Sequence, residues 1–175
     1  MREALVVVDM LADFLDPTGT LYCGDAARGI IPAVHEAVEK ARARGIPVLY
    51  VADTHDPDDP EFQVFPPHCV AGTWGSGVIP EILPQEGEPV IAKRRFSGFY
   101  GTDLDLRLRE RGIDSLVLVG VCTNICVLYT AADARMRNYG VTVPRDSVAS
   151  FDPEAGGFAL GQMEKVLGVQ VVSSW

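Results

Sequence analysis

The chain alternates short apolar runs with longer amphipathic stretches, and this alternation constrains its fold more than any other feature of the sequence. Residues 4–8, 47–51, 90–92 and 116–119 are continuous apolar runs, as is typical of strands that are buried on both faces. Weaker strands are predicted at residues 141–143 and 169–172. The sequence therefore predicts six strands.

Helical patterns lie between these strands. Residues 30–44 carry an apolar stripe at helical spacing that stops before Gly45. Thr102 is predicted to cap a helix that runs to Arg111, and further helices are predicted over residues 124–140 and 154–167. Strands that alternate with helices indicate βα units with right-handed crossovers. We therefore expect residues 1–175 to form a single α/β domain, with three α/β/α layers around a mainly parallel, six-stranded sheet.

The charge balance argues against two classes of partner. The 175 residues include 15 Lys and Arg against 24 Asp and Glu, which gives a formal net charge of −9. Nucleic acids and anionic membranes bind clustered positive charge, so neither is expected as a partner. The N-terminal apolar run is too short for a signal peptide, and the longest uncharged stretch, residues 116–132, falls short of a membrane span. We expect a cytoplasmic protein with reduced cysteines.

Residues 53–74 interrupt the alternation. The segment is rich in proline and holds two of the three histidines of the chain. A connection of this length inside a compact domain is usually functional or disordered. Its aromatic residues Phe62, Phe65 and Trp74 favour ordered packing.

Reactive side chains follow the first four predicted strands: Asp9, Asp53, Lys93 and Cys122. Each has an ordinary structural explanation, because an Asp can cap a turn, a Lys can be solvated and a Cys can act as a small apolar residue. Ligands of open parallel sheets, however, bind outside the carboxyl ends of the strands. The four residues together therefore predict a functional site at that edge.

Cys126 is the second candidate thiol. It lies four residues after Cys122, at the predicted first turn of a helix. The helix dipole there, together with the ammonium of Lys93, is expected to lower the pKa of the thiol. Cys122 and Cys126 could suggest a metal pair, but the sequence offers no second thiol pair for a zinc cage. Cys69, beside His68, and Cys23, in a Gly-rich loop, are interpreted as structural or incidental.

Asp53, His55, Glu61 and His68 form a second group of candidates. Carboxylate and imidazole groups are suitable ligands for zinc or a similar divalent ion, and residues 53–55 place two of them on one extended segment. The alternative is that both histidines are hydrogen-bonded to the backbone of the loop.

Three segments resemble the isochorismatase-like cysteine hydrolases, and within them the nicotinamidases. These segments are VVDMLADF at residues 7–14, KRRFSGF at residues 93–99 and GVCTNICV at residues 120–127. The resemblance covers essentially the whole chain and implies a Rossmann-like hydrolase fold. It assigns the catalytic residues as Asp9, Lys93 and the nucleophile Cys126, and the oxyanion hole as the backbone N–H groups of Cys122 and Cys126. It also implies a cis peptide bond between Val121 and Cys122.

Residues 53–55 and 65–70 resemble the metal-binding segments of nicotinamidases, and Glu61 resembles an additional acidic ligand of a bacterial subgroup. The resemblance implies a divalent metal cofactor, with Zn²⁺ favoured over Fe²⁺ or Mn²⁺. The chain departs from related motifs at two positions, since Asn124 stands where Asp is frequent and Phe65 where some relatives have Trp.

The activity implied by the resemblance is hydrolysis of nicotinamide to nicotinate and ammonia through a thioester, within NAD salvage. Phe14 and Phe96 are the candidate walls for the ring of this small-molecule amide, although either could be core. One alternative is a related cysteine amidase that acts on another small amide or carbamoyl compound. Another is a non-catalytic protein that binds small molecules on the same fold. An isochorismatase is disfavoured, because that activity does not need the cysteine. A homo-oligomer is expected because relatives commonly associate.

Overall fold

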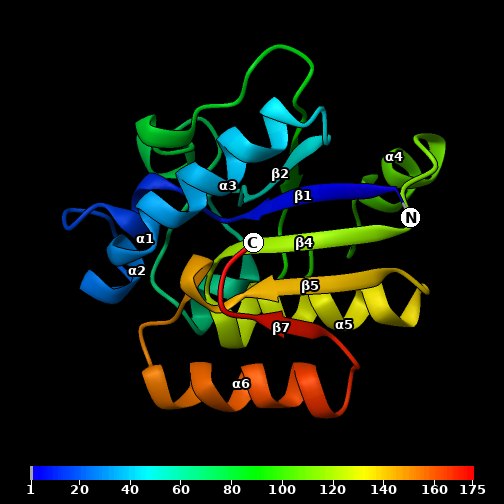
Figure 1. The fold of residues 1–175 in the computed structure, drawn as a ribbon. Helices are drawn as coiled ribbons and strands as arrows, with labels where there is room; N and C mark the ends of the chain where they lie inside the picture. The colour runs from blue at the N-terminus through cyan, green and yellow to red at the C-terminus, as the bar shows by residue number, and fades with distance from the viewer. Residues whose placement is uncertain (1) are drawn as a thin grey trace.

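The computed structural model of the protein describes residues 2–175, which form a parallel sheet covered by helices on both faces (Figure 1). The sheet has the order β3-β2-β1-β4-β5-β7, and β6 pairs with β4 beyond this path. Every pair of neighbouring strands is parallel. The strands are β1 (Glu3–Val8), β2 (Val48–Asp53), β3 (Val90–Lys93), β4 (Ser115–Val121), β5 (Gly140–Pro144), β6 (Val148–Ala149) and β7 (Gln170–Val172).

The predicted α/β class is confirmed, but the sheet has seven strands and not six. The additional strand, β6, contains only Val148 and Ala149, which pair with Gly120 and Val121 at the end of β4. Two residues are too few to produce a recognisable apolar run, so this strand depends on its neighbour in the sheet and not on its own pattern.

The strand at residues 90–93 also differs from its prediction. We expected it to be buried on both faces, but β3 lies at the edge of the sheet and its residues alternate between exposed and buried. Val90 is half exposed, whereas Ile91 and Lys93 point into the protein. A short apolar run alone does not distinguish a central strand from an edge strand.

The two faces of the sheet are packed separately, as alternation along β1 requires. Leu5 and Val7 pack with α3, α1 and α2 on one face. Val6 and Val8 pack with α4, α5 and α6 on the other. The helices are α1 (Ala12–Leu15), α2 (Asp25–Gly29), α3 (Ile31–Ala43), α4 (Leu104–Glu110), α5 (Leu128–Met136) and α6 (Pro153–Lys165).

The helix predictions are confirmed for α3, α4, α5 and α6, whereas the short helices α1 and α2 were not predicted. At α4 the first residue outside the helix is Asp103, and Thr102 lies one position earlier. The Oγ1 atom of Thr102 still accepts a hydrogen bond from the backbone N–H of Leu104 at 3.3 Å. Within residues 2–175, none of the helices is both long enough and apolar enough to cross a membrane.

Candidate active site and metal-binding cluster

The carboxyl ends of four strands bring the predicted reactive residues to one edge of the sheet. Asp9 follows β1, Asp53 and Lys93 are the last residues of β2 and β3, and Cys122 follows β4. The register pairs Asp53 directly with Lys93. The predicted convergence of these positions is therefore a consequence of the parallel topology.

Lys93 is the centre of a buried charge cluster. Its Nζ atom lies 2.5 Å from Oδ1 of Asp53, 2.8 Å from Oδ2 of Asp9 and 3.5 Å from Sγ of Cys126. The second carboxylate oxygen of Asp9 accepts a hydrogen bond of 2.8 Å from the backbone N–H of Asp53. All four residues are buried, so one cation compensates two carboxylates with little help from water.

Burial controls the protonation of this cluster. Burial and the neighbouring carboxylate of Asp53 raise the pKa of Asp9 to about 6, although Lys93 opposes the shift. Burial also raises the pKa of the Cys126 thiol, and the carboxylates of Asp9 and Asp53 add to the effect against the opposing Lys93. The predicted lowering of this thiol pKa is therefore wrong, because desolvation and two anions outweigh the single nearby cation.

The two cysteines of the predicted nucleophile segment have different surroundings. A cis peptide bond joins Val121 to Cys122, as predicted. Residues Thr123–Val127 form a π-helical turn, and Cys126 lies within this turn beside Lys93. The Sγ atom of Cys122 instead lies 3.4 Å from Sγ of Cys23. Only one of the two thiols therefore belongs to the charge cluster.

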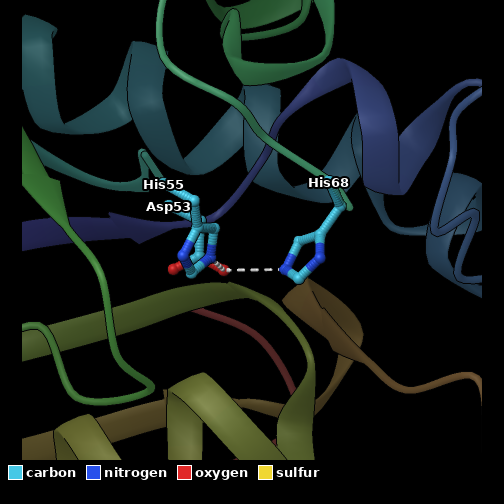
Figure 2. A group of neighbouring side chains, drawn as sticks. All are labelled: Asp53, His55 and His68. Carbon is cyan, nitrogen blue, oxygen red and sulfur yellow. Dashed lines mark ion pairs between the residues drawn. The ribbon is translucent and has the colours of Figure 1, made fainter. Parts of the chain in front are cut away.

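A second cluster shares Asp53 with the first. Oδ2 of Asp53 lies 3.7 Å from Nε2 of His55 and 3.8 Å from Nε2 of His68. Figure 2 shows His68 reaching toward this carboxylate from the opposite side of a gap, with His55 beside Asp53. The candidate ligand atoms of the three buried residues all lie within 4.8 Å of one another.

The two imidazoles are oriented as metal ligands are. Nδ1 of His55 lies 3.1 Å from Oδ2 of Asp59, and Nδ1 of His68 lies 2.8 Å from the carbonyl oxygen of Pro66. These contacts leave both Nε2 atoms for the common point near Asp53. Among residues 2–175, no group hydrogen-bonds to the buried Nε2 of His55. A nitrogen- and oxygen-rich set with such an orphaned atom fits zinc or another divalent ion.

The alternative reading of the histidines is therefore partly correct, since His68 is bonded to loop backbone through one nitrogen and still presents the other. Glu61 lies at the margin of the cluster, with Oε1 4.0 Å from Nε2 of His55. It is carried by the 3₁₀ turn Pro60–Gln63, one of four such turns in the connections; the others are Trp74–Ser76, Pro80–Ile82 and Arg145–Ser147.

Both clusters border one pocket, which Asp9 and Cys126 line together with Asp53 and His68. Phe14 and Phe96, the two predicted ring contacts, line it, and so does Phe65. The sequence did not indicate the other apolar lining residues, which are Leu21, Cys23, Val121, Ile125 and Phe151. Val121 is the last residue of β4, and the others come from loops and from the turn after β4, where no periodic pattern marks a side chain as facing a cavity.

The loop of residues 53–74 is ordered around this pocket. Phe62 packs edge-on against both histidines, with ring centroids 5.4 Å from His55 and 5.7 Å from His68. Phe65 packs against Phe96 at 6.4 Å. Trp74, in contrast, is more than half exposed, so it contributes less to the packing of the loop than predicted.

Comparison with known proteins gives consistent matches along the whole chain. The family model for the isochorismatase domain matches residues 3–174. The structure of nicotinamidase PncA from Bacillus subtilis is 37% identical, with a TM-score of 0.94 and coverage of 98% of this chain and 99% of that one. N-carbamoylsarcosine amidase from Thermoplasma acidophilum is 43% identical, with a TM-score of 0.89 and coverage of 98% and 96%. Pyrazinamidase of Pyrococcus horikoshii in complex with zinc is 34% identical, with a TM-score of 0.91 and coverage of 98% and 99%.

Proposed function

The chain belongs to the isochorismatase family, and we propose that it is a metal-dependent cysteine amidohydrolase that converts nicotinamide to nicotinate and ammonia. The observation that carries this proposal is the position of Asp53. One of its oxygens contacts the lysine of the Asp9–Lys93–Cys126 cluster, and the other faces the two imidazoles. The reactive thiol of Cys126 and the imidazole of His68, which is proposed to help orient the ring nitrogen through the metal, thus line the same pocket.

In the proposed reaction, Sγ of Cys126 attacks the carboxamide carbon while Asp9 accepts the thiol proton. The tetrahedral oxyanion is stabilised by the backbone N–H groups of Cys122 and Cys126. Collapse of this species breaks the C–N bond, and the proton held by Asp9 goes to the departing ammonia. Asp9 then accepts a proton from water as the water attacks the thioester carbon. The C–S bond breaks to release nicotinate, and Asp9 returns the proton to Sγ of Cys126, which restores the thiol.

Lys93 holds Asp9 in place and favours negative charge on Cys126, because its ammonium contacts both. Phe14 and Phe96 provide apolar walls for the ring. Asp53, His55, Glu61 and His68 would hold the divalent ion, with zinc favoured over iron or manganese. When bound, that ion supplies a positive site for the pyridine nitrogen.

A second candidate is amide hydrolysis of a different small substrate such as a carbamoyl compound. The 43% identity with N-carbamoylsarcosine amidase supports it. The aromatic lining and the imidazole cluster favour the nicotinamide substrate, because a flat ring with a basic nitrogen matches both features. A non-catalytic binding protein is disfavoured, since binding alone gives no reason to bury Asp9, Lys93 and a thiol together.

We propose that residues 1–175 act as a single domain in the cytoplasm, within NAD salvage. The proposed partner is a small-molecule amide, and neither nucleic acid nor a membrane is proposed as a partner. The proposed assembly is a homo-oligomer.

Ammonia release from nicotinamide, pyrazinamide and N-carbamoylsarcosine tests the proposal, with the protein assayed as purified, after metal removal and after zinc is restored. We expect turnover of the two ring amides that falls on metal removal and recovers with zinc. Preferred turnover of N-carbamoylsarcosine would select the second candidate. Unchanged activity and substrate affinity after metal removal would exclude the metal role.

The nucleophile is tested by Cys126→Ala, with Cys122→Ala as the matched control. We expect the first variant to lose turnover and the second to retain it, because only the Cys126 thiol contacts Lys93. Mass spectrometry of quenched reactions should find the acyl adduct on the peptide that contains Cys126. Retained activity in Cys126→Ala together with its loss in Cys122→Ala would refute the assignment.

A further inference from the structure

Asp59 is a buried carboxylate beside the proposed metal cluster that the proposed function does not use. It follows β2 in the loop between His55 and Glu61 and is only 5% exposed. Its neighbours Asp56 and Asp58 are exposed, so Asp59 is the one acid of these three that the fold of the loop buries. Burying a carboxylate is costly unless hydrogen bonds compensate it, and here each oxygen has a defined partner.

The first partner is His55. Oδ2 of Asp59 lies 3.1 Å from Nδ1 of this imidazole. A carboxylate accepts hydrogen bonds, so the contact places the imidazole proton on Nδ1 and leaves the lone pair on Nε2. That Nε2 atom is the one that faces Asp53. Asp59 therefore selects the tautomer and ring orientation that a metal ion requires.

The second partner is the turn that carries Glu61. Oδ1 of Asp59 accepts a hydrogen bond of 2.9 Å from the backbone N–H of Glu61, and this bond caps the 3₁₀ turn Pro60–Gln63. Glu61 is thereby held with Oε1 4.0 Å from Nε2 of His55. The two oxygens of one carboxylate thus position two separate candidate ligands.

Arg95 contacts both Asp59 and Glu61 from the solvent side. Its Nη1 atom lies 3.1 Å and 3.2 Å from the two oxygens of Asp59 and 3.8 Å from Oε2 of Glu61. The guanidinium compensates negative charge that would otherwise repel within the cluster. Because Arg95 sits in the segment just after Lys93, the turn is also tied to the carboxyl end of β3.

From these contacts we propose that Asp59 is a positioning residue that sets the affinity of the protein for its divalent ion by orienting His55 and Glu61 together. The inference rests on the metal cluster of the proposed function, and it assigns no role in bond breaking to Asp59. Groups that orient metal ligands in this way typically contribute about 10- to 100-fold in affinity.

Zinc affinity of the metal-free protein tests the proposal directly, measured by competition with a chromophoric chelator. We expect zinc binding to weaken about 100-fold in Asp59→Ala and about tenfold in Asp59→Asn, since the amide oxygen can still accept from one of the two partners. Asp56→Asn is the matched control, because Asp56 lies in the same loop but pairs with Arg94 at the surface. The control should bind zinc within twofold of the wild type.

Two further readouts separate positioning from a general effect on the loop. In ¹⁵N spectra of the imidazoles, His55 should be protonated on Nδ1 in the metal-free wild type and should populate both tautomers in Asp59→Ala. Urea unfolding of the metal-free variants shows whether each one folds. Arg95→Gln is a milder variant, for which we expect zinc affinity to fall by a few fold.

The outcomes distinguish this proposal from the proposed function. If folded Asp59→Ala binds zinc within twofold of the wild type, or keeps a single His55 tautomer, positioning by Asp59 is refuted whatever the substrate. If the wild type binds zinc and Asp59→Ala binds it weakly, but nicotinamide is not hydrolysed, the positioning role stands and the proposed activity fails. A wild type that binds none of Zn²⁺, Fe²⁺ and Mn²⁺ overturns the metal cluster and this inference with it.

Discussion

The Nζ atom of Lys93 lies 2.5 Å from Oδ1 of Asp53, while the other oxygen of the same carboxylate faces His55 and His68. Lys93 and the imidazoles outweigh the effect of burial and hold the pKa of Asp53 well below its usual value. Asp53 therefore stays ionised between the two clusters. We therefore expect a substitution at Lys93 to alter the environment of the two imidazoles, and a change at the imidazoles to alter that of Lys93.

Replacing Lys93 with Met should be among the most destabilising single substitutions in the protein. It leaves Asp9 and Asp53 buried without their shared cation, and loss of one partner of a buried ion pair costs about 3–5 kcal/mol of unfolding free energy. Urea unfolding measures this loss, and the exposed Lys165→Met serves as the control. A loss below about 1 kcal/mol would mean that the carboxylates are not charged in the folded protein.

Gly75→Ala should weaken zinc binding from outside the metal cluster. A Cβ atom at Gly75 would overlap the carboxylate of Asp13, whose Oδ2 accepts a 2.7 Å hydrogen bond from the backbone N–H of Cys69, next to His68. We expect a loss of about 1–3 kcal/mol in unfolding free energy from this overpacking, together with reduced zinc affinity.

Gly157→Ala is the control for that substitution, because a Cβ atom there meets no atom within 4 Å and the residue lies inside α6. It should stabilise the protein by about 0.5–1 kcal/mol through helix propensity. Equal zinc affinity in the wild type and Gly75→Ala would show that Asp13 moves without disturbing His68.

The ion pair between Arg42 and Glu88 should make stability depend on pH. Two hydrogen bonds of 2.9 Å and 2.7 Å join these side chains. Burial alone would raise the pKa of Glu88, but the bonds from Arg42 and from the N–H of Gln85 lower it below its usual value. A lowered folded pKa stabilises the protein above the unfolded pKa of about 4.3, and the contribution disappears as pH falls through the folded pKa.

Glu88→Gln should therefore lower the unfolding free energy by about 1–2 kcal/mol at pH 7. The difference from the wild type should persist at pH 5 and shrink below about pH 4. Urea unfolding of both proteins across this range measures it. A difference that is constant down to pH 3 would assign the effect to packing and not to the charge of Glu88.

Phe151→Ala should affect substrate binding more than turnover. Phe151 lines the pocket but remains 54% exposed, so it covers the site from the solvent side. Loss of one aromatic contact of about 1 kcal/mol corresponds to a roughly fivefold higher KM with kcat within twofold. The exposed Phe158→Ala is the control, since Phe158 lies on α6 away from the pocket lining. A fall in kcat with unchanged KM would contradict this assignment.

The strands β1 to β4 could be predicted because each contains a continuous apolar run, and the parallel order then places Asp9, Asp53 and Lys93 at one edge. The run at residues 90–92 also shows the limit of this reasoning, since nothing local indicates whether a strand has one neighbour or two. The short helices α1 and α2 and the two-residue strand β6 depend on tertiary contacts and leave no periodic signal.

The site could be predicted only where residue type and strand position coincide. Asp56, Asp58 and Asp59 are equivalent as sequence, and only the fold of the turn Pro60–Gln63 decides that Asp59 is the one that points inward. The pKa of Cys126 was predicted in the wrong direction for a similar reason. The depth at which Cys126 is buried, which is the largest cause of the raised pKa, becomes apparent only when the strands are assembled.

The cation at the centre of the site is supplied by a strand at the edge of the sheet. Within residues 2–175, β3 pairs with β2 alone, yet it brings Lys93 to carboxylates from β2 and from the end of central β1. As the chain is synthesised, Asp9 and Asp53 precede their counter-ion by tens of residues. The register between β3 and β2 therefore decides whether the buried carboxylates receive their cation. A slip of β3 by one residue would turn Lys93 to the other face of the sheet and leave both carboxylates without it.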